Sequence, residues 1–140
     1  MCYTAARWTP SRKSSAARSW RASARAFVAA GWRFRTCDRR YPGHPDVVVP
    51  RAHTFIEVRG CFWHRHGCAV SSMPKSNVEF WTTKWANNVR RDRRHEADWK
   101  DLGWNVILVW ECALRPVRRE ETLVRICQAL DASGERRTRP

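Results

Sequence analysis

Apolar residues recur along this 140-residue chain with the two spacings that predict helices and strands. In residues 15–30 they lie three and four positions apart and stop at Gly31, which predicts an amphipathic helix. Residues 32–37 alternate between apolar and polar side chains, as in a half-buried strand. Residues 106–110 are continuously apolar and mostly β-branched, as in a strand buried on both faces. The other predicted elements are short strands at 46–49 and 53–58, a helix that begins with a capping box at 76–79 and runs to residue 102, and a helix at 119–130.

This order of elements, α-β-β-β-α-β-α, predicts one α/β domain in which a mixed sheet lies between two layers of helices. The predicted domain covers residues 15–130, between a basic arm at 1–14 and a polar, basic tail at 131–140. The length fits a single domain. The sequence contains no run of 18 apolar residues, so no membrane-spanning segment is predicted.

Positive charge dominates the composition. The chain has 27 Lys and Arg against 13 Asp and Glu, and a formal net charge of +14. Residues 1–40 hold ten of the basic residues and a single acid, Asp38. Such an excess favours a polyanionic partner, because each neutralised phosphate releases counterions. On charge alone we expect nucleic acid, with an acidic membrane or ribosomal RNA as the alternatives.

Two carboxylates and a cation lie near the ends of neighbouring predicted strands. Asp46 opens one strand, while Glu57 and Arg59 share one face near the end of the next, because strand side chains alternate with a period of two. Carboxylates suit Mg²⁺, and a cation stabilises the charge that develops on a phosphate during hydrolysis. The pattern is compatible with a metal-dependent nuclease. It is also compatible with an Asp46 that caps a turn beside a surface pair of Glu57 and Arg59.

Cysteines and histidines cluster in the irregular stretch at 60–74. Cys61, His66 and Cys68, together with Cys112 after the apolar strand, have the types and number of side chains of a closed, tetrahedral Zn²⁺ site. Such a site would be structural, and the metal would order a loop that has little apolar content of its own. The alternative is a reduced, buried cysteine pair with exposed histidines.

His64 lies in the same loop but is not needed for that set of four ligands. A neutral imidazole there would be placed to deprotonate a water for attack on phosphorus. The alternative is a solvent-exposed loop histidine. The neighbouring Phe62 and Trp63 form an apolar pair in a polar loop, which predicts either a packing anchor or a wedge inserted between base pairs.

Three motifs occur in order along the chain: Tyr-Pro-Gly-His-Pro-Asp at 41–46, Gly-Cys-Phe-Trp-His at 60–64 and Val-Trp-Glu-Cys-Ala-Leu at 109–114. With these motifs, residues 31–115 resemble the very-short-patch repair (Vsr-type) endonuclease family, a branch of the PD-(D/E)XK nuclease superfamily. The resemblance implies a restriction-endonuclease-like, three-layer α/β domain, with a mixed sheet flanked by helices and a structural zinc site. It also implies a Mg²⁺-dependent enzyme that nicks DNA 5′ to the thymine of a T:G mismatch and so starts very-short-patch repair.

The resemblance assigns roles to particular residues. Asp46 and the backbone carbonyl of Val58 would bind Mg²⁺, and His64 would be the catalytic histidine. Apart from the resemblance, this chain's own Glu57 and Arg59 are predicted to support the metal or the phosphate. The structural zinc ligands would be Cys61, His66, Cys68 and Cys112, and the aromatic wedge beside the mismatch would be Phe62, Trp63 and Trp81.

One departure from the family pattern keeps a second function open. The family usually carries a Glu in its first helix, close to the metal, whereas Trp20 occupies that position here and no acid precedes Asp38. The alternative is a zinc-stabilised DNA-binding module with weak or lost nuclease activity, and a more distant one is a zinc-ribbon protein that binds RNA. For the mismatch endonuclease we expect a monomer in the bacterial cytoplasm, associated with the nucleoid and not with a membrane. Its expected partners are double-stranded DNA with a T:G mismatch and mismatch-repair proteins.

Overall fold

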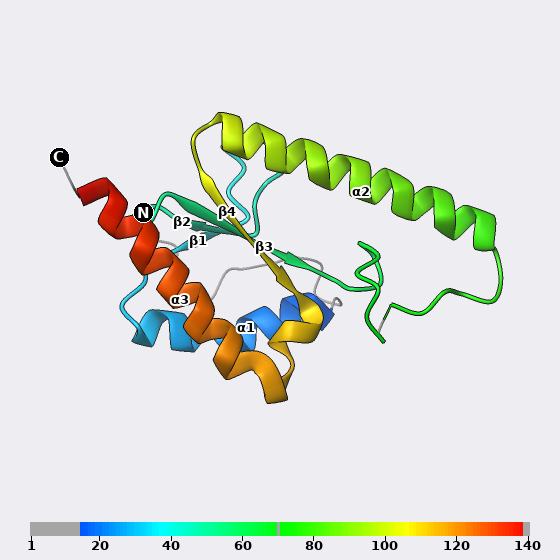
Figure 1. The fold of residues 1–140 in the computed structure, drawn as a ribbon, viewed down its shortest axis with the longest axis horizontal. Helices are drawn as coiled ribbons and strands as arrows, with labels where there is room; N and C mark the ends of the chain where they lie inside the picture. Colours follow the sequence, from blue (N-terminus) through cyan, green and yellow to red (C-terminus); the bar gives the residue numbers. More distant parts are fainter. Residues whose placement is uncertain (1–14, 70, 139–140) are drawn as a thin grey trace.

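The computed structural model describes residues 15–69 and 71–138. Their order of helices and strands is the one predicted (Figure 1). The elements are α1 (Ser15–Ala29), β1 (Arg35–Thr36), β2 (Val47–Val49), β3 (Thr54–Arg59), α2 (Val78–Asp101), β4 (Asn105–Trp110), the short 3₁₀ helix η2 (Glu111–Leu114) and α3 (Pro116–Thr138). The predicted arm at 1–14 lies outside the described residues. No helix of the described part has both the length and the apolar content that crossing a bilayer requires.

The four strands form one mixed sheet in the order β1-β2-β3-β4. β2 is antiparallel to both β1 and β3. β3 and β4 are parallel, with Thr54 opposite Asn105 and Arg59 opposite Trp110. Two parallel neighbours need a long crossover connection, and the 60–74 loop together with α2 provides it. The predicted mixed sheet is therefore confirmed.

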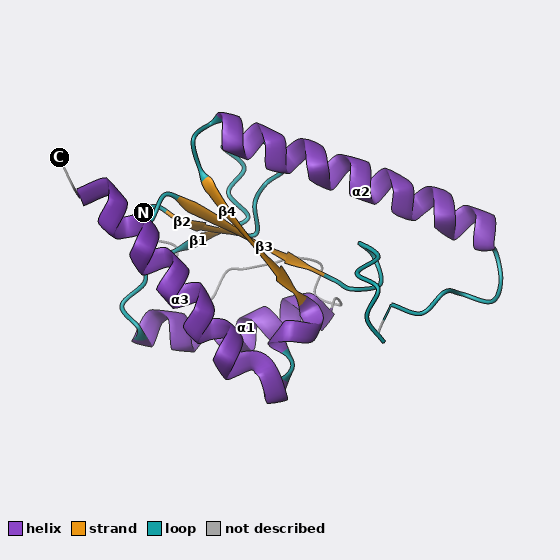
Figure 2. Cartoon of the chain, viewed as in Figure 1, coloured by secondary structure: helices purple, strands orange, loops and turns teal. Residues whose placement is uncertain are grey.

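Helices cover both faces of this sheet: α1 and α3 lie on one side and α2 on the other (Figure 2). The three valines of β2 show how the sequence achieves this. Val47 and Val49 belong to the larger core under α1 and α3, whereas Val48 packs with Phe55 and Trp99 in the smaller core under α2. Successive strand side chains point to opposite faces, so an unbroken apolar strand such as β2 holds two cores together.

Two predicted strands differ from the observed ones. β4 is not buried on both faces: among the described strands it pairs only with β3, and Val109 is its only buried residue. The apolar run at 106–110 therefore belongs to an edge strand, in which Leu108 is 38% exposed. The strand predicted at 32–37 contains only two paired residues, Arg35 and Thr36, and the Cys37 that follows them has a left-handed backbone (φ 48°). Its predicted alternation is right, since Trp32 and Phe34 are buried.

The predicted capping box at 76–79 is wrong. Asn77 is the N-cap of α2 in a left-handed conformation (φ 52°, ψ 41°), and no side chain caps the helix. Asn is one of the few residues apart from Gly that adopt this conformation readily, so the chain turns into the helix one residue later than Ser76 would require. α3 also differs, because it begins with Pro116 and continues to Thr138, through most of the segment predicted as a tail. Pro fits a first helical position, where its missing N–H would have no partner.

Candidate active site and metal cluster

Asp46 and Glu57 meet at the end of the β2–β3 pair. The antiparallel register places Val47 opposite Ile56, so the residue before β2 lies beside Glu57 on β3. The backbone N–H of Asp46 donates to Glu57 Oε2 at 3.4 Å, and Asp46 Oδ2 accepts from the N–H of Val58 at 2.8 Å. The structure thus brings together three of the residues that the sequence proposed for a metal.

The surroundings of these two carboxyl groups disfavour their negative charge. Burial raises the pKa of Asp46 to about 6, although the Val58 N–H and the charges of His64 and Arg59 oppose the rise. Burial and then the neighbouring Asp46 carboxylate raise the pKa of Glu57 to about 8. Two carboxylates in one partly buried site repel each other. A divalent cation that prefers hard oxygen ligands would relieve both the repulsion and the lost hydration, so the donor set fits Mg²⁺.

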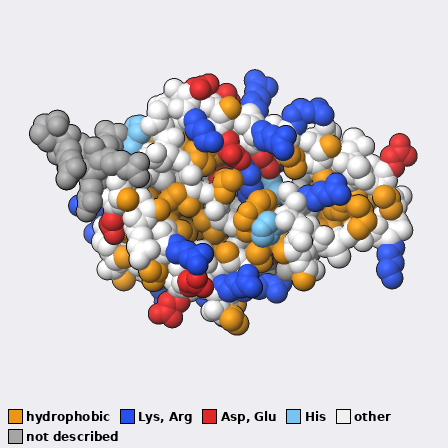
Figure 3. Space-filling view, viewed as in Figure 1, with side chains coloured by type: hydrophobic (Ala, Val, Ile, Leu, Met, Phe, Trp, Pro, Cys, Tyr) orange, Lys and Arg blue, Asp and Glu red, His pale blue; other side chains and the backbone are white. Residues whose placement is uncertain are grey.

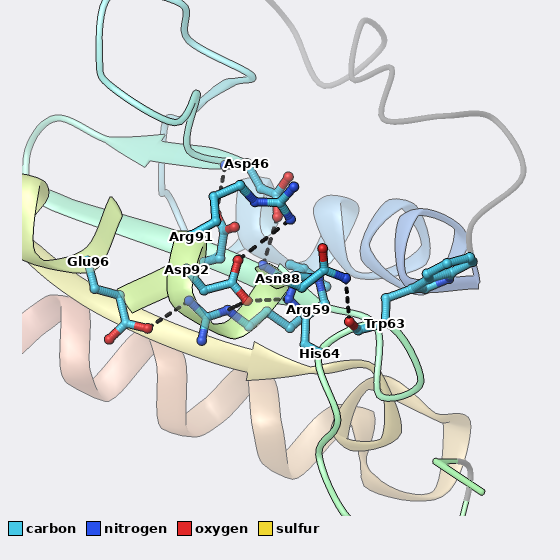
Figure 4. A network of polar contacts seen from close by, with 10 residues as sticks. Asp46, Arg59, Trp63, His64, Asn88, Arg91, Asp92 and Glu96 are labelled. Carbon is cyan, nitrogen blue, oxygen red and sulfur yellow. Dashed lines mark hydrogen bonds and ion pairs between the residues drawn. The ribbon is translucent and has the colours of Figure 1, made fainter. Parts of the chain in front are cut away.

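His64 is held by a carboxylate of α2. Its Nδ1 lies 2.5 Å from Oδ2 of Asp92, whose residue is only 5% exposed (Figure 4). Burial acts against the Asp92 charge, but the His64 hydrogen bond and the positive charges of Arg59 and Arg91 outweigh it and lower the Asp92 pKa. An ionised carboxylate only accepts hydrogen bonds, so Nδ1 of His64 carries the hydrogen of this contact and Nε2 takes no part in it.

The sequence prediction missed Asp92, although a signal was present. Trp85, Asp92 and Trp99 are the buried residues of α2 and lie seven positions apart. They occupy one stripe of the helix, since two helical turns span about seven residues. An acid between two tryptophans on a buried stripe needs a buried partner, and His64 is that partner.

Arg59 points across to α2 rather than into solvent. It is 7% exposed, and its Nη2 donates to Glu96 Oε1 at 2.7 Å, while its Nε lies 3.9 Å from Asp92 Oδ2. The alternative of a surface pair between Glu57 and Arg59 is therefore wrong. Arg59 is an internal countercharge for the carboxylates around it, and this placement does not support the predicted phosphate contact.

The three predicted wedge residues form one aromatic cluster beside this site. The Phe62 ring centroid lies 5.3 Å from that of Trp63 and 5.1 Å from that of Trp81, and it also packs edge-on against the buried Trp85. Trp63 is 47% exposed. Asn88 Nδ2 donates to the Trp63 carbonyl at 2.8 Å and so ties the loop to α2 (Figure 4). In this cluster Phe62 is packed between the other aromatic rings, and Trp63 is the exposed residue.

Cys61, His66, Cys68 and Cys112 also come together, with ligand atoms that all lie within 4.8 Å of one another. The His66 Nδ1 atom is 3.6 Å from Cys61 Sγ and 3.5 Å from Cys112 Sγ. Zn–S and Zn–N bonds of about 2.3 and 2.05 Å at a tetrahedral angle place sulfur and nitrogen about 3.6 Å apart, so the cluster fits a tetrahedral Zn²⁺.

The protein environment supports such a metal in two further ways. Burial raises the pKa of Cys61 to about 12, so a thiolate there needs a bound cation. The His66 ring stacks on Trp110 with centroids 4.2 Å apart, which fixes its orientation. Neither Cys61 nor Cys112 forms a disulfide.

Comparison with known proteins agrees with this geometry. The family model for the DNA mismatch endonuclease Vsr matches residues 9–70, which contain Asp46 and the loop with His64. The chain is 47% identical over 85 residues to the DNA mismatch endonuclease Vsr of Escherichia coli (strain K12), a match that covers 61% of this chain and 54% of that relative. It is 42% identical over 85 residues to the type II nicking enzyme V.NmeAIP of Neisseria meningitidis, with 61% of each chain covered.

The chain thus spans little more than half the length of these two relatives. A third match is longer. The type II nicking enzyme V.XorIIP of Xanthomonas oryzae pv. oryzae is 41% identical over 95 residues, which cover 68% of this chain and 70% of the relative. With this match and that of the family model, the chain belongs to the Vsr family of DNA mismatch endonucleases.

Proposed function

We propose that this protein is a Mg²⁺-dependent DNA endonuclease that nicks one strand 5′ to the thymine of a T:G mismatch. The observation that carries this proposal is the pair of His64 and Asp92 beside the two carboxyl groups of Asp46 and Glu57. A histidine oriented by a buried carboxylate is a general base, and neighbouring acids suit a divalent metal. The relatives named as a mismatch endonuclease and as nicking enzymes support the same activity.

Asp46 and the backbone carbonyl of Val58 would hold the Mg²⁺ ion, and Glu57 would add a second carboxylate. When bound, the ion neutralises charge that develops on the scissile phosphate. Glu57 would also replace the carboxylate that the family usually carries in its first helix. At that position α1 carries Trp20, which is 1% exposed and packs in the core. The second acid would therefore come from β3.

His64 would take the proton from the attacking water through Nε2. The water oxygen forms a bond to phosphorus as the bond from phosphorus to the leaving sugar oxygen breaks, and the sugar oxygen is finally protonated. Asp92 is a positioning residue in this scheme, because it fixes the imidazole through Nδ1 and stabilises the positive charge that His64 gains.

The Cys61, His66, Cys68 and Cys112 cluster would hold a structural Zn²⁺. Four protein ligands close the coordination sphere and leave no position for a substrate. The metal would join the 60–74 loop to η2, which supplies Cys112. That loop carries His64, Phe62 and Trp63, so the zinc would hold both the base and the wedge in place.

The cluster of Phe62, Trp63 and Trp81 would enter the duplex next to the mismatch. Unstacking a base step costs a few kcal/mol, and a mismatched pair costs least. The wedge would therefore favour mismatched over matched DNA through deformability. The fold would be of the restriction-endonuclease type, and the protein would act as a monomer in the bacterial cytoplasm, at the nucleoid, together with mismatch-repair proteins.

The test is a nicking assay on a labelled duplex with a single T:G mismatch, Mg²⁺ and the purified protein. We expect a nick on the thymine strand that is absent from the matched duplex and absent with Asp46→Ala. A nick that persists with Asp46→Ala contradicts the metal assignment. Binding without any nick contradicts the endonuclease and favours the second candidate function, a zinc-stabilised DNA-binding module. The buried Trp20 in place of the family's helix acid is the observation that keeps this second candidate.

A further inference from the structure

A groove of about 420 Å³ runs between the turn at Pro42 and Gly43 and the outer side of α2. The turn is held firmly against the helix. Trp99 Nε1 donates to the Pro42 carbonyl at 2.6 Å. Gly43 packs so closely on His95 that a Cβ atom would lie 2.5 Å from the imidazole ring, and its φ of +73° also favours glycine. The groove therefore has two rigid walls.

The helix wall of this groove is basic. Arg90, Arg91 and Arg94 line it, with Asp98 as the only acid among the lining residues. No carboxylate of the described residues lies within ion-pair distance of Arg90 or Arg94. Burial and the charge of Arg91 lower the pKa of His95, so the positive charge of this wall comes from its arginines. Lys and Arg side chains are spread along the α2 side of the molecule (Figure 3).

Of the acids of α2 near this wall, Asp98 lines the groove, whereas Asp92 and Glu96 have cationic partners on the side that faces the site. Asp92 is bound to His64 and Glu96 to Arg59, both on the side that faces the site. Asp98 is therefore the one carboxylate that faces the three groove arginines from among the lining residues, and the groove keeps an excess of positive charge.

The groove also opens next to the site. Arg91 Nη2 lies 3.8 Å from Asp92 Oδ1, and the Arg91 side chain is 56% exposed. Figure 4 shows this contact between Arg91 and Asp92, the carboxylate that is bound to His64. A strand whose scissile phosphate lies at Asp46 and His64 would pass these guanidinium groups with its neighbouring phosphates. Arg59, the cation that the sequence suggested for this task, is already paired with Glu96.

We propose that Arg91 and Arg94, in the groove between the 42–43 turn and α2, bind backbone phosphates of the nicked strand next to the cut. Guanidinium groups bind phosphate through paired hydrogen bonds. These contacts would set the register of the strand without reading its sequence. The inference rests on the proposed function, because it takes DNA as the ligand and locates the phosphates relative to the proposed cut.

The first test measures binding to the T:G duplex by fluorescence anisotropy without Mg²⁺, over a range of salt concentrations. Arg91→Gln and Arg94→Gln should each weaken binding about tenfold at 0.1 M salt and lower the slope of log Kd against log salt by about 0.9 per lost phosphate contact. The loss should be equal for matched and mismatched duplexes. Arg118→Gln, an exposed arginine of α3 on the other side of the sheet, is the matched control. Circular dichroism melts check that each variant folds.

The second test replaces single phosphates on either side of the cut by neutral methylphosphonates. The wild type should lose affinity at one or two positions, whereas the variant that lacks the matching arginine should lose little more there. Binding of both variants that equals that of Arg118→Gln overturns the proposal, as does an equal methylphosphonate penalty in wild type and variants at every position. If the wild type binds but does not nick, the endonuclease proposal fails, while the groove is still judged by these binding measurements.

Discussion

Replacement of Glu57 by Gln should stabilise the protein while it abolishes nicking. The folded state holds Glu57 and Asp46 together where burial and mutual repulsion disfavour their charge. A neutral amide of nearly the same shape removes the charge and keeps an oxygen that accepts the Asp46 N–H. The expected gain is therefore absent below the pKa of Glu57 in the unfolded chain, and it grows as the pH rises toward the pKa in the folded protein.

The sign and size of the change in stability follow from the pKa of Glu57. The Glu57 pKa rises from 4.5 to about 8 in the folded protein. A raised folded pKa means that the folded state binds the proton more tightly, so stability is full below pH 4.5 and is lost as the pH rises through about 8. A rise of about 3.5 pKa units corresponds to a ceiling of about 5 kcal/mol. Water and counterions that reach this partly exposed pair reduce it to about 2 kcal/mol.

The assay is thermal unfolding followed by circular dichroism at pH 5.0 and pH 8.5. No Mg²⁺ is added, and chelators are left out because they would also remove zinc. At pH 8.5, Glu57→Gln should melt about 6 °C above the wild type, and at pH 5.0 the difference should be small. Added Mg²⁺ should raise the melting temperature of the wild type more than that of the variant. Glu120→Gln, at an exposed position of α3, is the control and should change neither value.

A variant that is less stable than the wild type at pH 8.5 would refute this reasoning, because Glu57 would then be a stabilising carboxylate. A gain of equal size at both pH values would refute the ionisation argument, since packing and not charge would account for it.

Three other substitutions have equally definite outcomes. Asp92→Asn should lower the single-turnover nicking rate about 10³-fold, because His64 loses its charged partner, with unchanged DNA affinity; a rate equal to wild type would remove Asp92 from the mechanism. Cys112→Ser should lower the zinc content well below one ion per chain and reduce the melting temperature, whereas Cys127→Ser should keep the metal; equal metal analyses would contradict the four-ligand site. Trp63→Ala should reduce the preference for T:G over matched duplexes about tenfold, since a stacked ring contributes about 1–3 kcal/mol, without a change in melting temperature; a preserved preference would exclude Trp63 as the wedge.

The sequence predicted what depends on local patterns and on strand register. The order of elements and the meeting of Asp46 with Glu57 follow from periodicity and from an antiparallel pair joined by a short turn. The sequence prediction failed where the burial of a residue depends on an element that is distant along the chain. β4 lies at an edge because nothing in the described chain pairs beyond it. Arg59 turns inward because Glu96, 37 residues later, provides an internal partner.

Helix α2 has a consequence for where the strand is cut. The helix carries both Trp81 of the proposed wedge and Asp92, which is bound to the proposed base His64. Eleven residues separate them, or about 16 Å along the helix axis. In the proposed function, the number of helical residues between them would therefore set the distance from the mismatch to the bond that is broken. One residue inserted between these positions would turn Asp92 by about 100° away from His64. The length of α2 between Trp81 and Asp92 is therefore fixed by the contact between Asp92 and His64.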